Sequence, residues 1–341
     1  MKFILLFILL FTLRETNAES YGYLSADNIQ HSSITAFSND TISNNISYSV
    51  GGKLDKNSLT VLNAFIEVPH VRLGRVRYVY GLFNASRDYS PDFTPLTAPV
   101  SMYRPSMQRF MTSGDGIQLF DERMIGNTFI NASITMARPV FDNQDKISHD
   151  FLLSNSLGKI NPNRSSITSI DVFASNIEYG FAVNYSRNEL AIDINPNNFL
   201  GNPISNTDTM HAIMNNISFR KYFNNGIDLT AEYMFSTGHG NTWDAAQKFF
   251  DNSPHGNLIA LRYLGDNEYT VGLDYYNTGL NNLGVQSLQL SNQDTFSRSK
   301  WISIRKDITD KIIVKYQFTK LDGTACASYK TRSEIQLNYK F

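Results

Sequence analysis

Apolar and polar residues alternate along much of this chain. In the segment 332–341 the apolar members of the alternation are Ile335, Leu337, Tyr339 and Phe341, and their neighbours are polar or charged. The segments 227–236, 269–275 and 311–320 repeat this pattern, with Tyr and Phe on the apolar side and charges on the other. Successive side chains of a strand point to opposite faces, so each segment is predicted to be a strand with one apolar face. The aromatic residues favour lipid over a second sheet as the neighbour of that face.

Short and long connections alternate between these strands. The predicted tight turns, all of the Gly/Asn/Asp type, are 178–180, 224–226, 265–267 and 307–310. The long polar stretches between them are 192–208, 237–255, 278–298 and 321–330. Towards the N-terminus, further strands are predicted near 20–28, 30–38, 42–50, 57–67, 71–82, 114–120, 127–137, 168–177 and 180–190. The pattern predicts an all-β fold, a transmembrane antiparallel β-barrel of sixteen strands.

The N-terminal segment has the pattern of an export signal. Lys2 precedes an apolar run over residues 3–11, and a polar stretch ends at Ala18. We therefore expect a secretory signal peptide over 1–18, removed after Ala18, and a barrel over 19–341. The apolar run is too short to cross a bilayer as a helix.

The net charge argues against a nucleic-acid-binding protein, and the cysteine content argues against a protein stabilised by disulfides. The formal net charge of −1 argues against a nucleic-acid partner, which requires a basic surface. Cys326 is the single cysteine of the sequence, so no intramolecular disulfide can form. Closing a sheet into a barrel pairs the backbone groups and removes the edges, and we expect this closure to supply stability instead.

The stretch 71–120 carries the most distinctive residues. It contains Leu73-Gly74-Arg75-Val76-Arg77, then Arg87-Asp88, a proline-punctuated run to Tyr103, and Gly114-Asp115-Gly116 entering a strand. Together with the signal peptide and the terminal Phe341, this stretch resembles the porins of Gram-negative (proteobacterial) outer membranes. The motif of the PEFGG type found in the third loop of enterobacterial general porins is absent, so no constriction residues are transferred from those proteins.

The resemblance has implications for fold, function and partners. It implies a sixteen-stranded barrel in the bacterial outer membrane, commonly a homotrimer, that passes small hydrophilic solutes without a cofactor. It also implies a third outer loop folded into the barrel, and recognition of the C-terminal strand, with Tyr339 and Phe341, by the barrel assembly machinery.

Charged residues near this loop are candidates for the pore constriction. The order of turns and loops makes residues 83–113 the third outer loop, and its prolines favour a fixed path. The candidate constriction residues are Arg75, Arg77, Arg87, Asp88, Asp92, Arg104 and Arg109. Alternation predicts that Arg75 and Arg77 point inward, opposite Val76. If the loop folds into the lumen, we expect Asp88 and Asp92 to face them across the pore.

Other charged residues are predicted to line the lumen elsewhere. The inward-facing arginines are Arg220, Arg262, Arg305 and Arg332, and the inward-facing acids are Asp228, Glu232, Asp274 and Glu334. Because both signs are present, the ion preference stays open.

Catalytic and metal-binding functions have little support in the sequence. The six histidines are scattered, and none is paired with a serine and an acid in the pattern of a hydrolase. His239 and His255 lie in one long loop with Asp244 and Asp251, but their spacing matches no metal motif. The alternative to a channel is a barrel that acts as a surface adhesin or scaffold through the long loops 138–167, 192–208 and 237–255.

Overall fold

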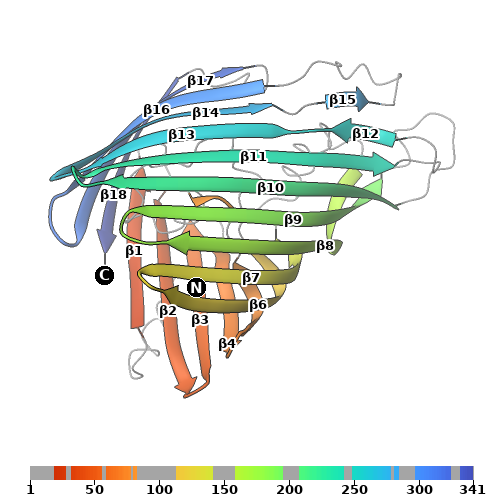
Figure 1. Ribbon diagram of the computed structural model, residues 1–341, viewed down its shortest axis with the longest axis horizontal. Helices are drawn as coiled ribbons and strands as arrows, with labels where there is room; N and C mark the ends of the chain where they lie inside the picture. The colour runs from red at the N-terminus through yellow and green to blue at the C-terminus, as the bar shows by residue number, and fades with distance from the viewer. Residues whose placement is uncertain are drawn as a thin grey trace.

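The protein forms one closed antiparallel sheet (Figure 1). The computed structural model describes residues 19–27, 32–55, 59–77, 80–82, 113–140, 158–194, 207–241, 248–277, 280–283, 296–323 and 331–340. The strands are β1 (Glu19–Asp27), β2 (Ser32–Ser43), β3 (Ile46–Asp55), β4 (Leu59–Val68), β5 (Val71–Arg77), β6 (Ser113–Ile125), β7 (Thr128–Pro139), β8 (Gly158–Ser175), β9 (Tyr179–Ile194), β10 (Thr207–Phe223), β11 (Ile227–Asn241), β12 (Lys248–Asn252), β13 (His255–Leu264), β14 (Asn267–Asn277), β15 (Leu280–Leu283), β16 (Phe296–Asp307), β17 (Ile312–Gly323) and β18 (Thr331–Lys340).

Pairing between the first and last strands closes the sheet. β1 pairs with β2 on one side and with β18 on the other, and both pairings are antiparallel. Leu24, for example, lies opposite Ile34 of β2 and Tyr339 of β18. A closed sheet satisfies the backbone hydrogen bonds of its strands without exposing an edge. The predicted antiparallel β-barrel is therefore confirmed.

Two of the eighteen strand segments continue the strand beside them in sequence. β11 pairs with β13 as far as Phe235 opposite His255, and then with β12 from Gly238 opposite Asn252. β15 pairs with β12 in the same way, beyond the end of the pairing between β13 and β14. Counted with their neighbours, the eighteen described segments occupy sixteen positions around the sheet. The number of strands that cross a membrane stays a prediction, because several connections lie outside the described residues.

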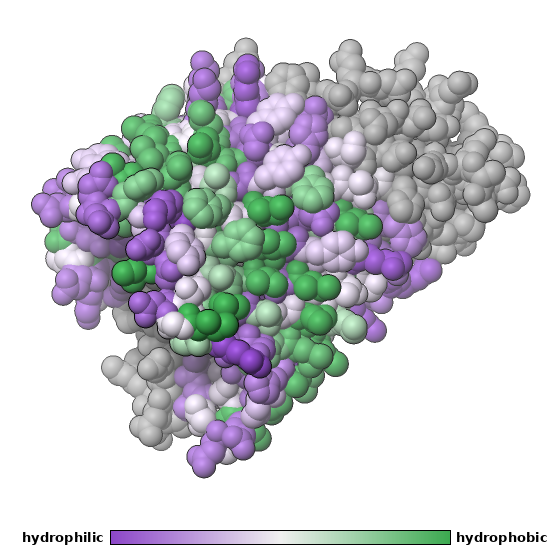
Figure 2. Space-filling model, viewed as in Figure 1, coloured by the Kyte–Doolittle hydropathy of each residue, from purple (hydrophilic) through white to green (hydrophobic). Residues whose placement is uncertain are grey.

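Where the structure describes side-chain burial, the two faces of the sheet differ in polarity, as the alternation predicted. On β17, Tyr316 and Phe318 are exposed, whereas Lys315 and Gln317 are buried. Exposed apolar side chains of neighbouring strands together form a band around the outside, to which Leu73, Ile117, Met136, Ile170, Phe219, Ile259 and Leu273 belong. Figure 2 shows hydrophobic side chains gathered over the strands in the middle of the view. A monomer in water rarely exposes so large an apolar surface.

The described residues include no helix that is long and apolar enough to cross a membrane.

Short turns join the strands at one end of the barrel (Figure 1). Gly226, in the predicted turn between β10 and β11, has φ of 77°, which favours glycine. A Cβ atom there would also lie 2.7 Å from the carbonyl oxygen of Leu264, whose amide donates to the Gly226 carbonyl. Between β8 and β9, the side-chain oxygen of Asn176 accepts hydrogen bonds from the amides of Glu178 and Tyr179. The turn after β10 lies over the predicted residues 224–226, whereas the turn after β8 lies over 176–178 and so begins two residues before the predicted 178–180.

The predicted strand over 42–50 was wrong, because it spans a hairpin. β2 ends at Ser43 and β3 begins at Ile46, so Asn44 and Asn45 form a tight turn between them. Asparagine favours such turns, since its side chain bonds to nearby backbone groups and it tolerates left-handed backbone angles. The predicted strand over 71–82 is also too long, because β5 ends at Arg77.

Candidate functional site

The connection that follows β5 enters the interior of the barrel. Tyr80, Gly81 and Leu82 are all buried. The amide of Leu82 donates a hydrogen bond of 3.3 Å to the hydroxyl of Ser218 on β10. Ser218 is buried between the exposed residues Ile217 and Phe219, so its side chain is on the inner face. Because β6 to β9 separate β5 from β10 in the sheet, the chain passes through the interior to reach this contact.

Tyr80 contributes a buried phenol to the same region. Burial raises the pKa of Tyr80 well above its usual value, and the charges of Tyr276 and Glu232 raise it further. The Tyr80 phenol is therefore neutral at physiological pH. Its oxygen is buried and makes no hydrogen bond within the part of the chain that the structure describes.

A group of arginines lines the inner face, and most of them pair with acids. Arg262 Nη2 lies 2.6 Å from Asp228 Oδ2, and Asp228 is almost fully buried. Arg305 Nε lies 2.8 Å from Asp307 Oδ1. On β18, Arg332 Nη2 lies 2.5 Å from Glu334 Oε1.

The predictions of inward orientation for these charges are confirmed. Arg220 is on the inner face too, and its Nε donates to Thr230 Oγ1 at 2.9 Å. The four predicted acids Asp228, Glu232, Asp274 and Glu334 are all buried there. Lys315 is also on the inner face, where it is fully buried and lies opposite Arg305 in the strand register.

On the inner face of β6 to β9, hydroxyl and amide side chains surround one acid, Asp171. Asp171 on β8 accepts hydrogen bonds from Ser133, Ser169 and Asn184, which come from β7, β8 and β9. Gln118 on β6 continues this network by donating to Thr135 at 3.0 Å. Such a network fixes the side chains of adjacent strands relative to one another. This part of the wall is therefore polar and ordered.

Arg72 on β5 is an inward-facing charge that is absent from the predicted lumen residues. Its Nε lies 2.6 Å from Glu67 Oε2, and its Nη1 donates to Gln118 at 3.1 Å. The guanidinium also lies 3.9 Å from the centre of the Phe120 ring, within the range of a cation–π interaction. The hairpin at Pro69-His70 could have revealed this pair, because it places Glu67 directly opposite Arg72.

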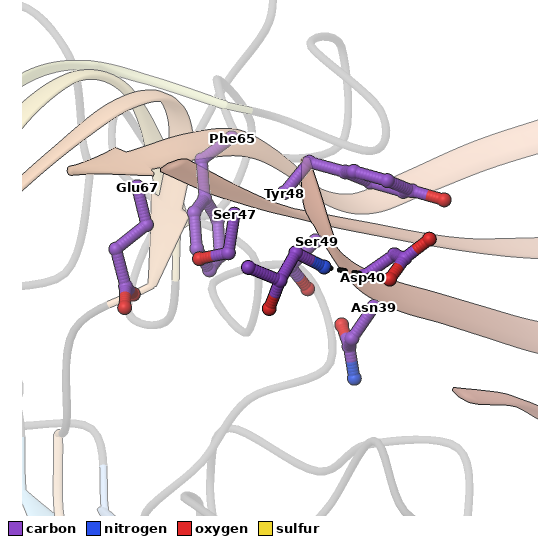
Figure 3. A pocket seen from close by; sticks show the side chains of 8 residues that line it. Asn39, Asp40, Ser47, Tyr48, Ser49, Phe65 and Glu67 are labelled. Carbon is purple, nitrogen blue, oxygen red and sulfur yellow. Dashed lines mark hydrogen bonds between the residues drawn. The ribbon is translucent and has the colours of Figure 1, made fainter. Parts of the chain in front are cut away.

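A recess of about 440 Å³ lies beside this group at the turn end of β2, β3 and β4. Its lining residues are Asn39, Asp40, Thr41, Ser47, Tyr48, Ser49, Phe65 and Glu67. Figure 3 shows Ser47 and Ser49 in the middle of this lining, between Glu67 and Asp40. Hydroxyl, amide and carboxylate groups supply most of its surface, so the recess suits water and hydrophilic solutes.

The orientation of Arg75 differs from the expectation that it lines the lumen. Its Nε lies 2.7 Å from Asp115 Oδ1, and Asp115 lies directly opposite it on β6. Asp115 alternates in phase with the exposed Ile117, and Arg75 with the exposed Leu73, so this ion pair is on the outer face. Val76, read as an outward apolar residue, is instead fully buried inside. Arg77 has the same strand phase as Arg75.

The remaining candidates for the constriction lie outside the described residues. They are Arg87, Asp88, Asp92, Arg104 and Arg109, and their roles stay predictions. The same holds for the export signal over 1–18, for Cys326 and for Phe341. Tyr339, the other residue of the predicted assembly signal, is exposed on the outer face. Within the described ranges, no three His, Cys, Asp or Glu side chains are placed to hold a metal ion.

Comparison with known proteins gives matches in structure alone. No protein-family model matches the chain, and no curated protein matches it either. OmpTdeltaL8, a loop-deletion mutant of the outer membrane protein OmpT of Vibrio cholerae, matches with a TM-score of 0.60 and 10% identity, over 95% of this chain and 99% of that one. The anion-selective porin of Comamonas acidovorans has a TM-score of 0.58 and 8% identity, over 95% and 99%.

A third solved structure agrees with these two. OmpF of Salmonella typhi has a TM-score of 0.55 and 11% identity, over 95% of this chain and 97% of that one. At such low identities the similarity concerns the course of the backbone. The chain has the β-barrel fold of Gram-negative outer-membrane porins.

Proposed function

We propose that the protein is an outer-membrane channel through which small hydrophilic solutes and ions diffuse passively. The hydrogen bond from Leu82 to Ser218 carries the proposal, because it brings the connection after β5 inside the barrel. A segment that crosses the interior narrows the passage, and a narrow polar passage selects solutes by width and charge. The apolar outer band supports a position in a lipid bilayer.

The wall that a solute would meet supports this function. Arg72, Arg220, Arg262 and Arg305 are held by hydrogen bonds or ion pairs on the inner face. Groups fixed in this way interact with a passing solute without first having to be ordered. The proposed transport is a passage along the wall and includes no catalytic step.

The residues 83–112 are proposed to continue from Leu82 as the constriction. Arg87, Asp88, Asp92, Arg104 and Arg109 would then contribute its charges. We further propose that the barrel acts as a homotrimer in the outer membrane, as the resemblance to porins implies.

The test compares single-channel conductance of deletion variants in planar bilayers. One variant lacks residues 92–103, and its control lacks the equally long segment 143–154 of the connection between β7 and β8. We expect the first deletion to raise the conductance of each channel and the second to leave it unchanged. Conductance equal to the parent's in both variants would show that the segment lies away from the passage. A parent that inserts without conducting would favour the adhesin or scaffold alternative.

A further inference from the structure

Two lysines lie directly opposite each other on the outer face of the barrel. Lys300 on β16 and Lys320 on β17 are partners in the strand register, and both are exposed. Side chains in this relation have Cβ atoms about 4.5–5.5 Å apart, and two like charges there destabilise the sheet. This arrangement therefore calls for a negative charge beside the two ammonium groups.

Among the described residues, one carboxylate lies beside the two lysines, and it already forms an ion pair with an arginine. Asp322 lies one row further along the same hairpin, and Arg298 Nη2 lies 2.5 Å from its Oδ2. Arg298 Nε donates to the same oxygen at 3.0 Å. Counting Arg298, Lys300 and Lys320 against Asp322 leaves an excess of two positive charges. Within the part of the chain that the structure describes, neither of the two lysines forms an ion pair.

The pair also lies at the edge of the apolar band. Ile302 and Phe318 follow the two lysines on the same face, towards the short turn, and both are exposed. In the other direction come the charged pair Arg298 and Asp322, and then the end of the hairpin that faces the long connections. A cationic site therefore borders directly on the surface that would contact lipid chains.

We propose that Lys300 and Lys320 together bind the phosphate group of a phosphorylated lipid in the outer leaflet. A phosphate brings negative charge and several acceptor oxygens, so both ammonium groups can donate to it. The acyl chains of the same lipid would lie along Ile302 and Phe318. This continuity of charged and apolar surface favours a lipid over a free phosphate ion. The inference rests on the proposed position of the barrel in an outer membrane.

The experiment measures thermal unfolding of the refolded protein in a neutral detergent with added lipid. The probe is a bisphosphorylated acyl glycolipid, compared with its dephosphorylated form and with inorganic phosphate at equal concentration. The variant is Lys300→Gln with Lys320→Gln. Its control, Lys306→Gln with Lys311→Gln, removes two exposed lysines at the opposite end of the same hairpin.

The melting temperature of the Lys300/Lys320 variant relative to the parent is expected to depend on the lipid. Without lipid, the Lys300/Lys320 variant should melt at or above the temperature of the parent, because the repulsion is gone. With phosphorylated lipid, the parent and control should melt at a higher temperature, and the variant should need on the order of tenfold more lipid for the same rise.

Three results would overturn the inference. They are an equal response of variant and parent to the phosphorylated lipid, an equal response of the parent to the dephosphorylated lipid, and an equal response to inorganic phosphate. The last would identify an anion site without a lipid. Conductance of the same preparations in planar bilayers tests the proposed channel separately. If the barrel conducts but does not respond to the phosphorylated lipid, the proposed lipid site is wrong and the proposed channel stands.

Discussion

Removing Arg262 should destabilise the barrel strongly, because it would leave a buried carboxylate without its partner. Asp228 has 3% of its side chain exposed and Arg262 has 21%, and Nη2 and Oδ2 are 2.6 Å apart. Truncating one member of a buried pair costs about 3–5 kcal/mol. Since Arg262 keeps a fifth of its surface in solvent, we expect a loss near the lower end, about 3 kcal/mol for Arg262→Leu.

The measurement is a double-mutant cycle on the refolded protein. The free energy of unfolding is compared for the parent, Arg262→Leu, Asp228→Leu and the double variant. The double variant should recover most of the loss, because it buries no unpaired charge. The matched pair is Arg298 and Asp322 on the outer face, both more than half exposed, for which solvent screening predicts no measurable coupling. A loss below about 1 kcal/mol for Arg262→Leu, or one that the second substitution does not relieve, would refute the reasoning.

Three further outcomes are expected. Gly272→Val should lower the melting temperature, because a Cβ atom at Gly272 would lie 2.0 Å from the ring of Trp301. Adding Trp301→Ala to this variant should restore part of the lost melting temperature. If the two substitutions instead lower the melting temperature additively, this contact is disproved. Above pH 10, stability should fall more steeply in the parent than in Tyr80→Phe, because burial raises the Tyr80 pKa above the unfolded value of 10.0, and parallel curves would contradict this. Arg72→Ala should change the ion preference of the channel, measured as reversal potential, whereas Arg72→Lys should preserve it, and an unchanged potential in Arg72→Ala would place this charge away from the passage.

The strand pattern and its two faces could be predicted from the sequence because both depend on local periodicity. On β17, apolar and polar residues alternate from Val314 to Thr319, and the structure follows them. On β5 the same reasoning assigned the wrong face to Arg75. Leu73 and Val76 are both apolar and three residues apart, so alternation cannot put both outside. The choice is decided by the pairing with Ile117 and Asp115 on β6.

The contacts that define the candidate site depend on long-range packing. The hydrogen bond from Leu82 to Ser218 joins residues 136 positions apart in the chain, and no local pattern signals it. The order of turns and loops did predict that the connection after β5 is the third one on its side. That prediction requires only a count of the turns. The residue of the wall that contacts the connection, Ser218, is known only once the barrel is closed.

Permeation of graded solutes into liposomes tests the central claim most directly. The purified protein is inserted, insertion is checked by protection from protease, and the influx of uncharged sugars of rising size is measured by liposome swelling. We predict rapid entry of small sugars and exclusion of larger ones, with the size limit raised by deletion of residues 92–103. Protease-protected protein that admits no sugar of any size would contradict the account.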